Sequence, residues 1–163
     1  MRHQYASASS RTQDATQVIV HPRLVDSLRC AIYAEIGTAA ESLDTAVTAG
    51  DREAHPERFR AAAQSLRESY GLLDSVGWTK TEPPVAVPLD LREDSWALVR
   101  ALDSAQEFAG EEVYEVSRDT DGQAPACETE RLCRLYSFTD EVQCCVDMLA
   151  VQEAVEFLPD LVA

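Results

Sequence analysis

A chain of 163 residues, 45% of them apolar, can bury one compact core and is too short for two ordinary domains. Its 29 acidic and 14 basic residues give a net charge of −15, which excludes tight, sequence-independent binding to nucleic acid, because that affinity comes from lysine and arginine displacing counterions. The same charge disfavours anionic membrane surfaces, and no apolar run approaches the roughly 20 residues that span a bilayer.

The first residues of the chain are polar, and residues 1–17 contain no apolar segment typical of a secretory signal. We expect a flexible, disordered tail over residues 1–20 and a single domain over residues 21–163. Five cysteines, an odd number without the Cys-x-x-Cys spacing, indicate reduced thiols and a cytoplasmic protein. Thirteen arginines against a single lysine, Lys80, are typical of a GC-rich bacterial genome.

The first helix is predicted to begin near Pro22, a residue suited to a first helical turn, and to run to about Thr48. At 100° per residue its apolar stripe comprises Val25, Ile32, Ile36, Ala39, Ala40, Leu43 and Val47. Arg29 falls on the same stripe, which leaves two interpretations. Either its stem packs and its head reaches solvent, or the guanidinium points inward and pairs with a carboxylate from another helix.

The second helix is predicted from about Pro56 to Gly77, with an apolar face made of Phe59, Ala62, Leu66, Tyr70 and Leu73. Trp78 follows at once and is expected to fold back onto the end of the bundle. The segment from Thr79 to Pro88 holds three prolines, so it is predicted to be an extended connection that cannot continue a helix. No segment of the chain is predicted as a strand.

The third helix is predicted from about Asp90 to Arg118, with the cleanest stripe of the chain: Leu98, Leu102, Ala105, Ala109, Val113 and Val116. After a turn over residues 119–125, a fourth helix is predicted from about Glu128 to Phe157, carrying Leu135, Phe138, Val142, Cys145, Val146 and Leu149. Four long helices with two short connections favour an all-α, antiparallel four-helix bundle.

Motifs that would specify catalysis are absent from the sequence. The six glycines form neither a dinucleotide-binding nor a Walker-type loop, and there is no Gly-x-Ser-x-Gly elbow. The Glu-x-x-His pairs that hold two iron ions inside helical bundles are also missing.

An acidic cluster on the third and fourth predicted helices offers one route to chemistry. Its spacing resembles that of the all-α nucleotide pyrophosphohydrolases, in which Glu-x-x-Glu on one helix and Glu-x-x-Asp on the next hold Mg²⁺ for attack on a triphosphate. The resemblance implies Glu112, Glu115 and Glu141 as the first three metal ligands. The fourth position is Cys144, and a thiol is a poor ligand for a hard cation.

A second acidic feature is the stripe Glu107, Glu111 and Glu115, which repeats like charge one turn apart at a cost in helix stability. Such a face suits a basic protein partner. With Trp78 as an aromatic anchor, the sequence favours a small, non-enzymatic bundle that regulates, adapts or inhibits another protein through Glu107, Glu111 and Trp78, without a cofactor. The alternatives are the Mg²⁺-dependent pyrophosphohydrolase or a degenerate nucleotide-binding relative, and a homodimer through a leftover apolar face remains compatible with the binding function.

Overall fold

The computed structural model describes residues 16–80, 83–120, 122–123 and 125–157, and it is mostly helical. Four long helices are present, as predicted. The elements in chain order are β1 (Gln17–Val20), α1 (Pro22–Thr48), the single-turn α2 (Asp51–Ala54), α3 (Pro56–Val76), β2 (Val87–Asp90), α4 (Leu91–Asp119) and α5 (Ala126–Phe157). The predicted tail residues 1–15 lie outside the described residues.

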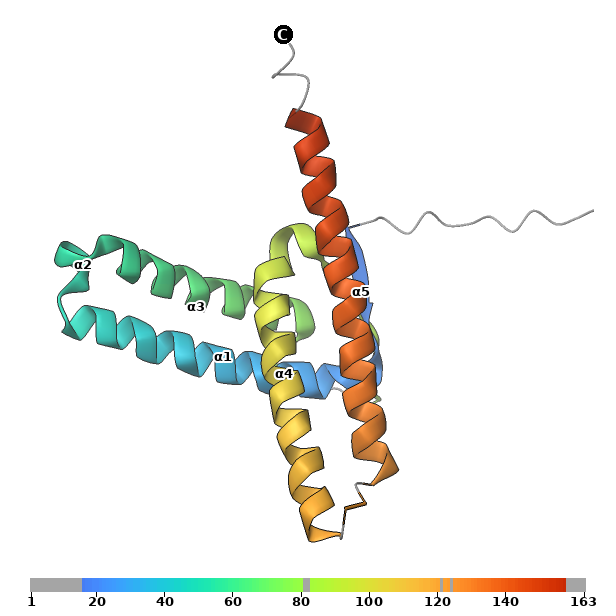
Figure 1. Ribbon diagram of the computed structural model, residues 1–163. Helices are drawn as coiled ribbons and strands as arrows, with labels where there is room; N and C mark the ends of the chain where they lie inside the picture. The colour runs from blue at the N-terminus through green and yellow to red at the C-terminus, as the bar shows by residue number, and fades with distance from the viewer. Residues whose placement is uncertain (1–15, 81–82, 121, 124, 158–163) are drawn as a thin grey trace, which may run out of the picture.

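The long helices form two antiparallel hairpins, α1 with α3 and α4 with α5. Figure 1 shows that the two hairpins lie across one another, with α4 and α5 passing in front of α1. The second hairpin is held on the first chiefly by contacts of α4 with α1 and with α3. The core is therefore concentrated where the hairpins cross, and the far half of each hairpin is a pair of helices with solvent around it.

The core at this crossing is aliphatic and closed to solvent. Leucines dominate it, in keeping with their well-defined packing in helices. Its largest fully buried side chains are Leu28, Ile32, Leu72, Leu73, Leu89, Leu91, Leu98, Leu102, Leu135, Val18, Val20 and Val142. Within the described ranges no helix is long and apolar enough to cross a membrane.

The structure also contains a short antiparallel ribbon, so the expectation that no segment is a strand was wrong. β1 pairs with β2 with Val18 opposite Leu89 and Val20 opposite Val87, and all but Val87 of these are fully buried. The Leu91 amide continues the ladder by donating to the Thr16 carbonyl at 2.8 Å. Residues 16–20, which were assigned to the tail, thus lie against the domain, because the side chains of Val18 and Val20 complete its core.

Local sequence signals fix where the helices begin. Pro22 opens α1 behind His21, whose ring Nδ1 accepts the Arg23 amide at 3.2 Å. Asp90 accepts the Arg92 amide at 3.0 Å, so it caps α4 rather than forming its first residue. Gly77, with φ of 95°, ends α3 in a conformation that side-chain-bearing residues rarely adopt, and it turns the chain toward Trp78.

Candidate protein-binding site

A buried arginine supports the turn after α3. Arg29 is only 7% exposed; its Nε donates to the Gly77 carbonyl at 2.8 Å, and its Nη1 pairs with Asp26 at 2.8 Å. The guanidinium is therefore inward, but its carboxylate partner lies one turn earlier on the same helix, so neither of the two interpretations holds in full. Because Gly77 precedes Trp78 directly, this buried charge anchors the backbone that presents the tryptophan.

Trp78 is held by three further contacts. Its carbonyl accepts the Tyr33 hydroxyl at 2.9 Å, and its indole N–H donates to the carboxylate of Asp74. Its ring stacks on that of Tyr70, with centroids 5.7 Å apart and planes inclined by 25°. Tyr33, Tyr70 and Trp78, here called the aromatic patch, come from α1, α3 and the loop after α3.

The aromatic patch remains open to solvent although its rings are fixed. Tyr33, Tyr70 and Trp78 are 45%, 40% and 48% exposed. Asp74 borders the indole and forms no ion pair with a described residue, whereas Asp26 is already paired with Arg29 at 2.8 Å and with Lys80 at 3.5 Å. Aromatic faces next to carboxylates attract a lysine or arginine head group through the ring quadrupole as well as through charge. The patch is thus suited to a cationic side chain of a partner.

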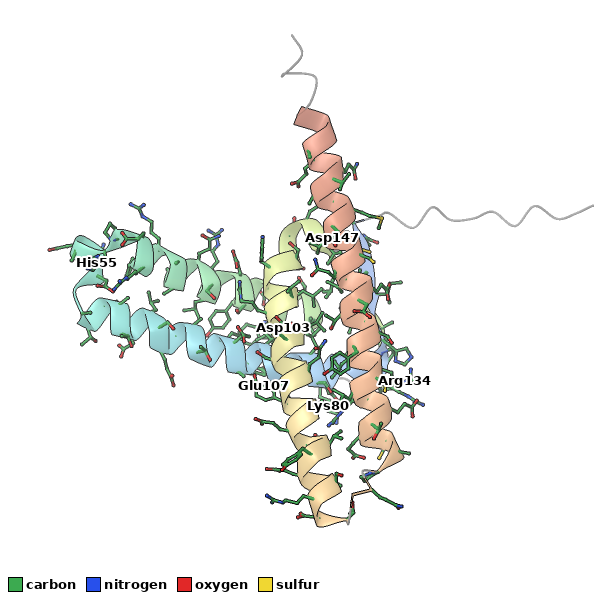
Figure 2. The ribbon with its side chains drawn as sticks, in the orientation of Figure 1. His55, Lys80, Asp103, Glu107, Arg134 and Asp147 are labelled. Carbon is green, nitrogen blue, oxygen red and sulfur yellow. The ribbon has the colours of Figure 1, made fainter. Side chains whose placement is uncertain are left out.

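The acidic side chains predicted as contacts lie on the outer surface of α4. Figure 2 shows Asp103 and Glu107 one turn apart on this helix. Glu107 and Glu111 are exposed, and neither forms an ion pair with a described residue. At 3.6 residues per turn, Trp96, Asp103, Glu107 and Tyr114 fall within about 40° of one another. This line, here called the α4 strip, carries a tryptophan that is 74% exposed and a tyrosine that is 69% exposed.

The three carboxylates implied as metal ligands are not brought together. Glu112 pairs with Arg131 across the α4–α5 hairpin, and Gln106 donates to Thr139 at 2.5 Å. These two contacts place Glu141 level with residue 103, about 13 Å along the axis from Glu112 and about 18 Å from Glu115 at 1.5 Å per residue. Among the described residues no group of three or more His, Cys, Asp and Glu side chains is positioned to hold a metal ion. Cys144, in the fourth position of the motif, is exposed.

A polar network ties the two hairpins together at their crossing. Arg100 of α4 reaches Glu68 of α3 at 3.1 Å and Glu35 of α1 at 3.8 Å. The Ser104 hydroxyl completes the network by donating to Glu35 at 2.6 Å. One cation lies between two partly buried carboxylates, each on a different helix, and so orients the helices. Because the carboxylates outnumber the guanidinium, the network keeps a negative charge.

Asp94 is a carboxyl group buried in the first turn of α4. Burial raises the pKa of Asp94, a hydrogen bond from Ser75 opposes the rise, and the nearby charges of Glu93 and Asp90 add to it. It borders a cavity of about 720 Å³ between α3 and α4, where Arg60 and Arg67 of α3 also lie.

We expect the Asp94→Asn variant to be more stable than the natural protein at neutral pH. An acid whose pKa is raised on folding favours the folded state most when it is protonated, so its contribution is lost as the pH rises through the folded-state pKa. At pH 7 the variant should melt at a higher temperature than the natural protein, and this difference should disappear as the pH falls below the unfolded pKa of aspartate. Melting curves across this range would check the sign. Asp103→Asn, at an exposed position on the same helix, is the matched control and should show no such trend.

Of the residues predicted to form a site, the structure gathers Trp78 with two tyrosines and places Glu107 and Glu111 on the exposed side of α4. Tyr33, Trp96 and Tyr114 were not predicted from the sequence as contact residues. The last two could have been found from their spacing of seven residues on either side of Asp103 and Glu107. Comparisons of the chain with protein-family models, with curated proteins and with solved structures found no match.

Proposed function

We propose that this protein is a non-enzymatic, cytoplasmic binding module that uses the aromatic patch to recognise a basic segment of another protein. The observation that carries the proposal is the patch itself: the ring of Tyr33 from α1 lies with the rings of Tyr70 and Trp78 at the end of α3. Each ring is fixed by a hydrogen bond or a stacking contact, yet each is at least 40% exposed. Tryptophan and tyrosine are the residues that most often dominate binding energy at protein interfaces.

Preorganisation supports a binding role for the patch. The Trp78 main chain is tied to Tyr33, and the preceding Gly77 carbonyl is tied to Arg29, so the loop has little freedom left to lose when a partner binds. Ordering of loops and side chains is one of the main costs of association. Rings that are already in place bind more tightly per unit of buried area than mobile ones.

Charge supports a basic partner. The chain carries −15 overall, and the exposed carboxylates Glu107 and Glu111 on α4 add to the field that an approaching cation meets. Charge of this kind mainly accelerates encounter and discriminates between partners, whereas buried aromatic contacts slow dissociation. In the proposed function, the patch therefore sets the lifetime of the complex and the acidic surface sets its rate of formation.

A quantitative capture experiment tests the proposal, and Trp78→Ala is the decisive variant. The full chain is immobilised, exposed to extract from cells that encode it, and the co-purified partner is measured at low and at high salt. We expect Trp78→Ala to weaken binding of a stoichiometric partner by about tenfold or more, because that is the effect of removing an interface anchor. Higher salt should reduce capture by the natural chain.

Trp96→Ala is the matched control because Trp96 is an even more exposed tryptophan on another face, the α4 strip. It should leave the dissociation rate unchanged, while Glu107→Lys with Glu111→Lys should slow association only. If Trp96→Ala weakens capture more than Trp78→Ala does, the anchor lies on α4 and the assignment to the patch is wrong. A partner whose capture does not respond to salt would remove the electrostatic part of the proposal.

A further inference from the structure

The outer edge of β1 carries backbone groups without a partner in the described structure. In an antiparallel pair, residues alternate between those that exchange hydrogen bonds with the neighbouring strand and those that point away from it. The bond from Leu91 to Thr16 identifies which residues of β1 are hydrogen-bonded to β2: the backbone amides and carbonyls of residues 16, 18 and 20 point toward β2. The amides and carbonyls of Gln17 and Ile19 therefore point away from β2, and no described residue bonds to them.

The two edges of this ribbon differ in how they are protected. Opposite Ile19 stands Pro88, which has no amide to offer on the outer edge of β2, and β2 also carries the charge of Asp90. Proline and charge are the usual protections of an exposed strand edge. β1 reads Gln-Val-Ile-Val, with neither proline nor charge and with three β-branched residues. Its edge is thus left open to another strand.

The surroundings of β1 favour an apolar, electrically balanced contact. Ile19 is 49% exposed and lines a cavity of about 560 Å³ between β1, the start of α1 and α5, with Leu24 and Phe138 at its side. At its rim Glu130 is paired with Arg134 at 2.6 Å and lies 3.6 Å from Arg23. Figure 2 shows Arg134 on α5. Glu141 also lies on this rim without an ion pair to a described residue, so Glu130 and Glu141 balance the charges of Arg23 and Arg134. A second acidic chain would therefore meet a rim without excess negative charge.

We propose that two copies of the chain associate through their β1 edges, pairing antiparallel to form a continuous four-stranded sheet in the order β2-β1-β1-β2. An antiparallel edge is complementary to itself about a twofold axis, which is the commonest symmetry of soluble oligomers. The axis passes by Val18, with Gln17 of one copy exchanging hydrogen bonds with Ile19 of the other, on both sides. A register shifted to include His21 is less favourable because the His21 carbonyl already accepts the Leu24 amide at 2.8 Å.

Ile19→Pro tests the proposal on the full-length chain. Proline at position 19 removes an amide that points away from β2, so the ribbon within one chain keeps its own hydrogen bonds. Ile19→Thr keeps the amide and the β-branched shape, and is the matched control. Sedimentation and light scattering over a range of concentrations should show a dimer for the natural chain and for Ile19→Thr. For Ile19→Pro, the dimer dissociation constant should rise more than tenfold, with an unchanged helical circular dichroism spectrum.

Amide hydrogen exchange separates the second copy from other occupants of the edge. If the dimer forms as proposed, the Gln17 and Ile19 amides should be protected in proportion to the dimer present, and dilution should expose them. A natural chain that stays monomeric at all concentrations would overturn the proposal. Protection that is independent of concentration and disappears when residues 1–15 are removed would overturn it as well, since that segment would then cover the edge.

Discussion

Leu98→Ala is expected to lower the free energy of unfolding by about 3 kcal/mol, within the range measured for leucines truncated in well-packed cores. Leu98 is fully buried on the face of α4 that packs where the hairpins cross. At this crossing four helices and the ribbon share one core, so the space left by the side chain is enclosed and the surroundings collapse into it poorly. Urea denaturation followed by circular dichroism would give the change from the transition midpoint.

Val99→Ala serves as the control for this prediction, because Val99 is the next residue of α4 and is only partly buried against the core. It removes fewer atoms from a site that solvent already reaches, so we expect a loss of about 1 kcal/mol or less. Equal losses at the two positions would contradict a core that is concentrated at the crossing of the hairpins.

The four helices were predictable because apolar residues recur at helical spacing over many turns. The stripe on α4 illustrates what this signal contains and what it lacks. Leu98, Leu102, Ala105 and Ala109 are buried as expected, whereas Val113 and Val116, on the same stripe, are only half-buried. The period identifies the inward side of a helix, but it does not say how far along the helix a partner extends. Here α4 runs past the crossing, so its later turns face α5 alone.

The ribbon could not be recognised from the same kind of pattern. β1 and β2 have four residues each and lie about 70 positions apart in the chain, so neither shows enough alternation to identify it. Pro88 also argues against a strand until it is known to sit on an edge. What makes these segments strands is the place they fill beside the leucines of the core, and that is a tertiary effect.

The three carboxylates of the metal-site hypothesis lie apart for a related reason. Positions around a helix can be computed from sequence, but the sliding of one helix against its neighbour depends on the turn between them. In this hairpin Glu112 lies level with Arg131, and the pair is satisfied across the interface. Glu141 is consequently far up the hairpin, on the rim of the cavity next to β1. A spacing motif in two helices predicts a site only when the connection sets the matching register.

The aromatic patch shows the opposite case, in which one residue was identified and its surroundings were not. Trp78 stood out because it follows the glycine that ends a helix. Tyr70 was expected to face the core and is instead 40% exposed, because its ring stacks on that of Trp78 in the loop after α3. Tyr33 falls outside the apolar stripe of α1. Its place in the patch depends on the hydrogen bond that its hydroxyl donates to the Trp78 carbonyl, which the sequence does not reveal.

Arg29 joins the stability of this protein to its proposed function, and Arg29→Met is expected to lower the free energy of unfolding by about 2 kcal/mol. Methionine replaces the packing of the aliphatic stem, but the Gly77 carbonyl loses a charged donor at a site where Arg29 is 7% exposed. The loop that carries Trp78 should loosen at the same time. In a Trp96→Phe background, the fluorescence of Trp78 alone would report this loosening as a shift in emission and as easier quenching by a soluble quencher.

The control for Arg29 separates the carbonyl contact from the ion pair. Asp26→Asn leaves the bond from Arg29 to Gly77 in place and weakens the ion pairs of Asp26 with Arg29 and with Lys80. Because Asp26 is half exposed, we expect a loss below about 1 kcal/mol and an unaltered Trp78 emission. If Asp26→Asn matches Arg29→Met in both measurements, the ion pair holds the loop and the bond to Gly77 does not. If Arg29→Met loosens Trp78 as expected, the variant should also bind the partner more weakly, although every ring of the patch is still present. That outcome would follow only if the patch binds as a preorganised surface, since a flexible patch would gain nothing from a buried arginine behind it.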